Sequence, residues 1–282
     1  MLTSRAMKRT LGVAACVLIL AACSKSETSD PKPAPVTDAA VAVMDAGPTS
    51  PRLTLDVSNP SPRAWTLSGE LLPAISEDGT QVALLVQKED GTRSYPNGVL
   101  EVHGVADDKV AASIAILEAD AIVTAEGAPD AFDTTLPAYK KQAQAKAEEA
   151  SQLLAKTKWT AMTPAIGMAP QGDAGAPILP VGAYLIALTK VAGKLSLVVA
   201  RASDQELKKP LLTQDATAFV VASRKTPKPQ KGDPICKFTP YVAETAIDPV
   251  NHVVAVRIAQ SVAGNVYGCL EPSQWHVYTS GP

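Results

Sequence analysis

The N-terminal segment imposes the strongest constraint on what this chain can become. An apolar run over residues 11–20 follows three cations, Arg5, Lys8 and Arg9, and two alanines then lead to Cys23. This order of basic, apolar and small residues is typical of a secretory signal peptide. A membrane-spanning helix needs about 20 apolar residues, twice the length of this run. We therefore expect cleavage after residue 22 and export of the remainder.

Leu20-Ala21-Ala22-Cys23 resembles the lipobox of bacterial lipoproteins. The resemblance implies that Cys23 becomes the first residue of the mature chain and carries lipid on its sulfur and amine. Ser24 rather than Asp follows it, which in families that obey this sorting rule implies the outer membrane, on its periplasmic face or at the cell surface. A cleaved signal without lipid and a retained membrane anchor are the alternatives.

The net charge of the mature chain argues against two classes of partner. The chain has 26 basic and 28 acidic residues, and three of the basic ones belong to the signal, so the mature chain has a net charge of −5. A mildly acidic chain without a basic stripe argues against nucleic acid as a partner. It also argues against charge-driven binding to anionic lipid, so attachment to the membrane falls to the lipid on Cys23.

The four cysteines divide by position. Cys16 leaves with the signal and Cys23 takes the lipid, so Cys236 and Cys269 remain as a pair in an exported chain. Oxidising compartments favour a disulfide between them. The bond would close a loop of about 33 residues and contribute about 3–4 kcal/mol in the chain-entropy model. A redox or metal role is the alternative, and it lacks the Cys-x-x-Cys spacing typical of both.

Composition divides the mature chain in two. Residues 23–52 are polar and rich in Pro and Ala, and such a segment buries too little surface to offset its chain entropy. We expect a disordered tether there and a globular β-rich domain over residues 53–282. Within that domain, residues 53–133 and 160–282 are expected to form a sheet each, bridged by a helix over 137–158.

Period-two alternation and turn residues predict the strands. Residues 73–87 contain two apolar runs around Glu77-Asp78-Gly79, a strong hairpin signal. Runs at 99–105 and 110–117 extend this hairpin to a four-strand antiparallel meander. The remaining strands are expected at 52–57, 183–189, 195–202, 216–223, 240–247, 253–259 and 274–279, and a long loop or hinge is expected at 164–180.

One hairpin resembles the blade repeat of periplasmic β-propellers. Ile75-Ser76-Glu77-Asp78-Gly79 fits the pattern except at Glu77, where Pro is usual. A weaker echo at residues 247–251 has Pro249 but lacks Asp-Gly. The fold class predicted is mainly β, built of antiparallel hairpins and meanders in a partial propeller-like or two-sheet architecture, and α+β because of the long helix. Thr134, Thr135 and Pro137 predict the start of that helix.

Signatures of catalysis are missing from the sequence. It contains no Gly-x-Ser-x-Gly, no His-Glu-x-x-His and no phosphate-binding loop, so we predict no catalytic residue, cofactor or metal site. His103, His252 and His276 lie in or beside predicted strands, and we expect them on solvated faces. A metal or acid–base site formed by His252 and His276, with Glu271 nearby, is the alternative.

These absences favour a non-catalytic binding or assembly module that presents a β surface to an unknown envelope protein or polymer. An envelope hydrolase with an unrecognised active site is the alternative. A hydrolase requires a concave pocket with converging polar groups.

Overall fold

The sequence places period-two apolar runs over most of its globular part, and the structure turns these runs into antiparallel strands. The computed structural model describes residues 50–87, 93–168, 177–204, 207–217, 238–262 and 273–280, which all belong to one unit of chain that begins at Ala46. The predicted signal peptide and nearly all of the predicted tether lie outside the described residues. So do the lipidation site Cys23 and the predicted disulfide partners, Cys236 and Cys269.

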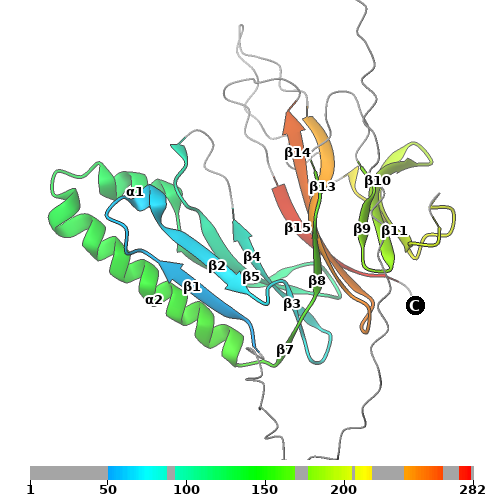
Figure 1. The fold of residues 1–282 in the computed structure, drawn as a ribbon, viewed down its shortest axis with the longest axis horizontal. Helices are drawn as coiled ribbons and strands as arrows, with labels where there is room; N and C mark the ends of the chain where they lie inside the picture. Colours follow the sequence, from blue (N-terminus) through cyan, green and yellow to red (C-terminus); the bar gives the residue numbers. More distant parts are fainter. Residues whose placement is uncertain are drawn as a thin grey trace, which may run out of the picture. The chain divides into compact units, whose positions relative to one another are not determined.

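Four sheets hold the described strands (Figure 1). Sheet A pairs β1 (Arg52–Asp56) with β2 (Thr66–Glu70). In spatial order, sheet B contains β6 (Val110–Leu117), β5 (Gly98–Gly104), β4 (Gln81–Gln87), β3 (Ala74–Ser76) and β7 (Trp159–Ala161). Sheet C contains β15 (Ser273–Thr279), β14 (Val253–Val262), β13 (Phe238–Asp248) and β8 (Thr163–Ile166). Sheet D contains β12 (Leu212–Asp215), β11 (Lys194–Arg201), β10 (Tyr184–Val191) and β9 (Leu179–Val181).

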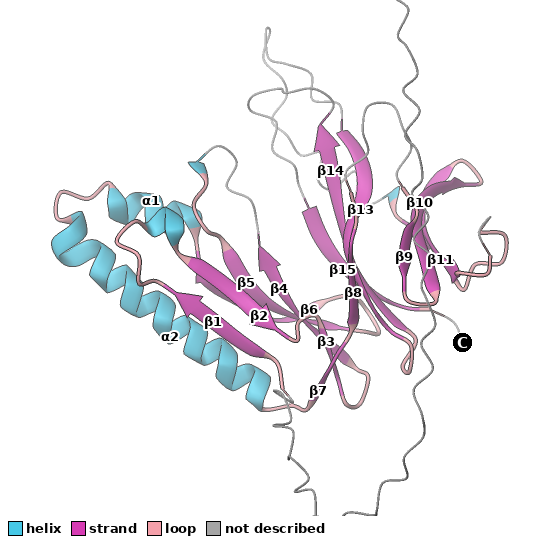
Figure 2. Ribbon diagram, viewed as in Figure 1, coloured by secondary structure: helices cyan, strands magenta, loops and turns pink. Residues whose placement is uncertain are grey.

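The helical segments are fewer (Figure 2). They are the 3₁₀ turn η1 (Pro62–Ala64), α1 (Ala119–Glu126), the π-helical turn η3 (Ala131–Thr135) and the long helix α2 (Leu136–Ala155). The predicted fold class, mainly antiparallel β with one long helix, is confirmed. Neither described α-helix combines the length and hydropathy needed to cross a lipid bilayer.

The longer apolar patterns in the sequence predicted strands well, whereas several short elements were not predicted. The meander over β3, β4, β5 and β6 is confirmed, and so is the hairpin of β10 and β11. The sequence missed β2, α1 and the three- or four-residue strands β7, β8 and β9. Two of these, β8 and β9, occupy the ends of the predicted loop at 164–180. In the predicted strand at 216–223, residues 216 and 217 follow β12 and the others lie outside the described residues.

The start of α2 differs in mechanism from the one predicted. Thr135 holds the N-cap position but makes no capping hydrogen bond. Both Thr134 and Thr135 instead donate their hydroxyls to the carboxylate of Asp130. The chain is already helical in η3 before α2 begins, so the threonines brace the entering turn rather than cap the helix. The face of α2 that packs inward consists of Leu136, Ala143, Ala150 and Leu154, which are buried.

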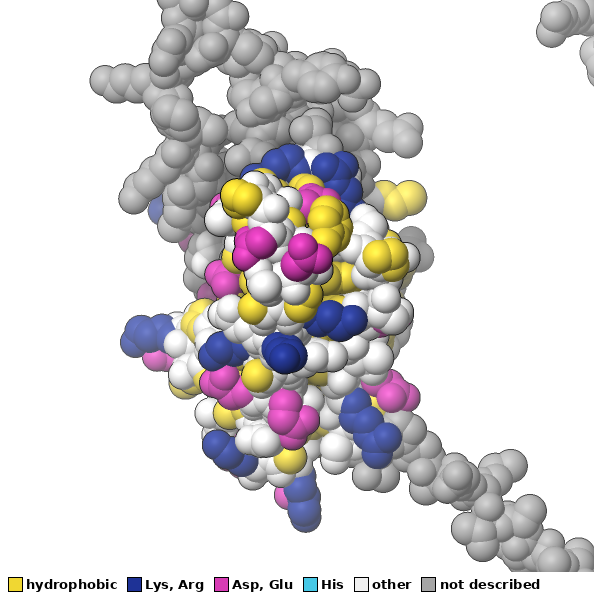
Figure 3. All heavy atoms as spheres, turned by 90° about the vertical axis from the view of Figure 1, so that its left-hand side faces the viewer, with side chains coloured by type: hydrophobic (Ala, Val, Ile, Leu, Met, Phe, Trp, Pro, Cys, Tyr) yellow, Lys and Arg dark blue, Asp and Glu magenta, His cyan; other side chains and the backbone are white. Residues whose placement is uncertain are grey.

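Three hydrophobic cores separate the layers. The first lies between one face of sheet B and a layer made of sheet A, α1 and α2. The second lies between the other face of sheet B and sheet C, and the third between sheet C and sheet D. Sheets B and C are thus buried on both faces, which explains continuous apolar runs such as residues 253–256. The outer face seen in Figure 3 carries basic and acidic side chains interspersed.

The two turns that share the propeller-like motif lie against each other. Gly79, in the turn between β3 and β4, has φ of +70°, and a Cβ built on it would lie 2.9 Å from Oδ1 of Asn251. Asn251 belongs to the turn between β13 and β14, where its amide donates to the Asp248 carboxylate at 2.6 Å. The contact therefore joins the β3–β4 turn of sheet B to the β13–β14 turn of sheet C.

Replacing Gly79 by Ala should destabilise the protein more than the same change at Gly193. Gly193 also has a positive φ, of +81°, but a Cβ there would meet nothing within 4 Å. The Gly193→Ala variant should lose about 1 kcal/mol for the left-handed backbone alone. Gly79→Ala should lose roughly 1 kcal/mol more, because Asn251 must give up its hydrogen bond to Asp248. Urea unfolding measures both, and equal losses would contradict the contact between the turns.

Candidate functional site

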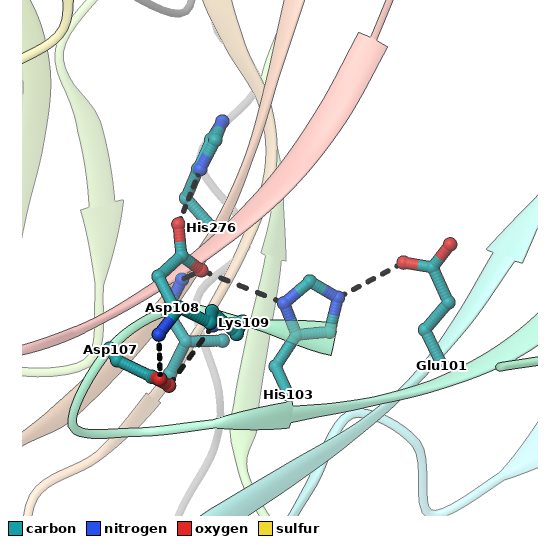
Figure 4. Close-up of polar contacts among 7 residues, drawn as sticks. Glu101, His103, Asp107, Asp108, Lys109 and His276 are labelled. Carbon is teal, nitrogen blue, oxygen red and sulfur yellow. Dashed lines mark hydrogen bonds and ion pairs between the residues drawn. The ribbon is translucent and has the colours of Figure 1, made fainter. Parts of the chain in front are cut away.

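A cluster of acidic and histidine side chains joins sheet B to sheet C (Figure 4). Its members are Glu101 and His103 on β5, Asp108 in the turn between β5 and β6, and His276 on β15. We refer to these four residues as the Asp108 cluster. Asp108 has φ of +54° and its backbone N–H donates to the carbonyl of Gly104 at 3.0 Å, so the tight turn directs its carboxylate away from sheet B.

The Asp108 carboxylate binds the outer edge of β15. One oxygen accepts a hydrogen bond from the backbone N–H of Val277 at 2.6 Å, and the other lies 2.7 Å from Nδ1 of His276. Because β15 is the last strand of sheet C, this N–H has no neighbouring strand to pair with. Val277 packs in the core between sheets B and C, whereas His276 points to the opposite face of β15. Asp108 therefore reaches around the strand edge.

His103 connects the Asp108 carboxylate to Glu101. Its Nδ1 lies 3.6 Å from Oδ1 of Asp108, and its Nε2 lies 3.0 Å from Oε2 of Glu101. Burial alone would lower the pKa of His103, but its polar and charge interactions with the carboxylates of Asp108 and Glu101 outweigh burial and raise the pKa to about 9. At neutral pH the ring is therefore an imidazolium, and both of its nitrogens are donors.

The protonation states of Asp108 and of the neighbouring Tyr278 are compatible with a positive charge on His103. Burial would raise the pKa of Asp108, but the nearby His103 ring and the hydrogen bonds from His276 and Val277 outweigh it and hold the pKa below its usual value. Tyr278 stacks on His276 with ring centroids 6.1 Å apart, and burial strongly raises its pKa, so it stays a neutral phenol. The cluster is thus a carboxylate–imidazolium network with a second histidine on the same carboxylate.

The expectation that the histidines lie on solvated faces was wrong for His103 and His276, which are 2% and 1% exposed. In the alternative site, Glu271 lies outside the described residues, and among the described histidines it is His103 that shares a partner with His276. His252 lies in the turn before β14, where its carbonyl accepts hydrogen bonds from the backbone N–H and the hydroxyl of Ser280. Hairpin geometry could have paired His103 with Asp108, but His276 is 168 residues from Asp108 in sequence and carried no such signal.

An open cleft of about 360 Å³ lies elsewhere, at the end of sheet B where β4 ends and β5 begins. We refer to it as the end cleft. Trp65, Thr66 and Leu67 line it from the layer of sheet A, and Glu244 and Arg257 line it from sheet C. Its other lining residues are Gln87, Tyr95, Pro96, Asn97, Gly98 and Leu117.

Local contacts hold the walls of the end cleft. Gln87 donates its side-chain amide to the carbonyl of Leu67 at 2.6 Å, which fixes β2 to the end of β4. The guanidinium of Arg63 lies 4.7 Å over the ring of Tyr95 and donates to its hydroxyl at 3.1 Å. The Tyr95 hydroxyl in turn donates to Glu126. The loop that carries Asn97 is therefore braced by a cation–π contact and two hydrogen bonds.

A β-bulge places the charges of the end cleft. The pairing of β13 with β14 shifts by one residue between Val242 and Glu244, so Glu244 lies opposite Arg257. Without the shift Glu244 would lie opposite Val256, on the face that packs against sheet D. The bulge instead brings Nη2 of Arg257 within 2.6 Å of Oε1 of Glu244, with 23% and 39% of the two side chains exposed.

The two sites differ in what they can do chemically. Of the clefts formed by described residues, three are not lined by His103, Asp108 or His276, but Glu101 lines one of them, of about 400 Å³. The end cleft is accessible, but its described lining contains no histidine, cysteine or serine. No group of three or more His, Cys, Asp or Glu side chains in the described part of the chain is arranged to hold a metal ion. Comparisons with family models, curated proteins and solved structures found no match.

Stability should fall as the pH rises from 6.5 to 9. The folded-state pKa of His103 lies above its unfolded value of 6.5, so its stabilising contribution is complete below pH 6.5 and is lost on the way to about pH 9. The loss should be on the order of 3 kcal/mol. Asp108 acts in the opposite sense, since its contribution is complete above its unfolded value of 3.8 and is lost as the pH falls below it. Urea unfolding at a series of pH values measures both limbs.

Three variants test the origin of this dependence. His103→Gln should abolish the loss between pH 6.5 and 9. Asp108→Asn should cost about 3 kcal/mol at pH 6, because it removes one of the two carboxylates that compensate the buried charge of His103. Asp107→Asn is the matched control, since Asp107 is exposed and pairs only with Lys109 at 2.9 Å; it should cost about 0.5 kcal/mol or less. Equal effects at positions 107 and 108 would contradict the role assigned to the cluster.

Proposed function

We propose that this chain is a non-catalytic binding or assembly module, held at the outer membrane of a bacterial envelope by lipid on Cys23. The lipobox-like Leu20-Ala21-Ala22-Cys23 supports the anchor. The observation that carries the binding role is the separation of the two sites. The histidines His103 and His276 are buried in the Asp108 cluster, whereas the accessible end cleft offers hydrogen bonds and an ion pair and has no histidine in its described lining.

The tether would separate the folded part of the module from the membrane. Residues 23–52 would span about 30 Å as a flexible chain, from ~5–6 Å multiplied by the square root of residue number. Its prolines extend that distance. The folded part would thus lie clear of the lipid surface, where an envelope protein or polymer can reach the end cleft.

An envelope hydrolase is the alternative, because the end cleft is concave and several polar groups converge on it. Two features argue against it. Thr66 supplies the one aliphatic hydroxyl of the described lining, and its hydroxyl makes no hydrogen bond to a base among the described residues. Glu244 already accepts a hydrogen bond from Arg257, so that carboxylate oxygen is occupied by a donor.

Replacing Cys23 by Ser should move the protein from the membrane fraction to the soluble fraction and abolish incorporation of a palmitate analogue. Cys16→Ser is the control, since it removes a thiol from the signal and leaves the acceptor in place. Fractionation with metabolic labelling gives both readouts. Retention of the Cys23→Ser variant in membranes would count against the lipid anchor.

A photo-crosslinking amino acid at Asn97 should capture a discrete species in intact cells, because Asn97 lines the end cleft. The same amino acid at Lys190, an exposed position at the end of β10, serves as the control. Gel shifts followed by mass spectrometry compare the two. Identical products from both positions, or none from Asn97, would contradict a binding role for the cleft.

A further inference from the structure

We infer that the end cleft binds a small zwitterion, either a free amino acid or a dipeptide, with its carboxylate on Arg257 and its ammonium group on Glu244. The inference rests on the proposed binding function and adds the chemical class of the ligand. It is carried by the ion pair, the size of the cleft and the chemistry of its walls.

The charges in the described lining of the end cleft balance. Arg257 is the one cation and Glu244 the one anion among those lining residues, and both side chains are partly exposed. A ligand with a single charge would satisfy one of them and compete for its partner, leaving the other without compensation. A ligand with both charges forms a second pair with each group and keeps the site neutral.

The guanidinium of Arg257 has N–H donors that are not used in hydrogen bonds within the described part of the chain. Nη2 donates to Glu244 at 2.6 Å and Nη1 donates to the hydroxyl of Ser273 at 3.3 Å, while Nε is enclosed and makes no hydrogen bond. A guanidinium has five N–H donors, so one carboxylate and one hydroxyl leave part of its capacity unused. Because the enclosed Nε has lost its water without gaining an acceptor, an additional anion at the Nη groups stabilises the guanidinium charge further.

The size and walls of the cleft favour a small peptide-like ligand over a sugar. Its volume of about 360 Å³ is at the lower end of the ~300–1,000 Å³ typical of small-molecule sites. Trp65 and Tyr95 are 5% and 7% exposed, so neither offers an open ring face on which a sugar could stack. Thr66 and Asn97 make no side-chain hydrogen bond within the described part of the chain, so both are available to the polar backbone of a peptide.

Calorimetric titration of the mature full-length protein with dialanine tests the inference. Dialanine should bind, and N-acetyl-dialanine amide, which has neither charge, should bind at least tenfold more weakly. Arg257→Gln and Glu244→Gln should each weaken the binding of dialanine at least tenfold. The double variant Lys194→Gln/Asp215→Asn is the matched control, because it removes another cross-strand ion pair, of 3.5 Å, on sheet D. It should bind dialanine like the wild type.

The outcomes distinguish a failure of the zwitterion inference from a failure of the proposed binding function. Equal binding of dialanine and N-acetyl-dialanine amide to the wild-type protein would overturn the zwitterion class. This comparison uses no variant, so its result does not depend on whether the variants fold. Binding of N-acetylglucosamine with no binding of dialanine or free alanine would also overturn it. Either result, together with a specific crosslink from Asn97, would leave the binding role standing. Loss of the Asn97 crosslink as well would remove both.

Discussion

The arrangement of the layers depends on one carboxylate at a strand edge. Asp108 binds an N–H of β15 that has no neighbouring strand, and the same carboxylate holds two buried histidines. A buried carboxylate is costly unless hydrogen bonds and opposite charge compensate it, and here both do. The turn between β5 and β6 thereby fixes the edge of sheet C relative to sheet B. It also covers an edge that could otherwise pair with another chain.

Sequence patterns predicted the parts of the fold that local physics determines. The strands β4, β5 and β6 were predicted because both faces of sheet B pack on a core, which requires long apolar runs, and the Asp78-Gly79 turn indicated the connection of β3 to β4. The strands β7, β8 and β9 were missed because three or four residues hold at most two full alternations. Helix α1 was missed because its apolar and β-branched residues resemble a strand.

The candidate sites were harder to predict, because their residues meet only after the sheets have stacked. Asp108 and His276 are 168 residues apart, and Arg257 lies opposite Glu244 only because β13 carries an extra residue. Neither relation leaves a periodic signal. An acidic residue in a turn gives no signal either, because a turn carboxylate normally accepts a hydrogen bond from its own backbone, as Asp107 does from the N–H of Lys109. Asp108 differs because its backbone conformation directs the side chain elsewhere.

The order of the layers differs from the order of the chain, and this has a kinetic consequence. Sheet B comes from residues 74–161, yet most of the strands that cover its second face lie in residues 238–279. Until that late segment is available, the apolar side of sheet B has nothing to pack against, and contacts so distant in sequence form slowly. The N-terminal strands of sheet B therefore cannot complete their packing during synthesis until the last quarter of the chain has been made.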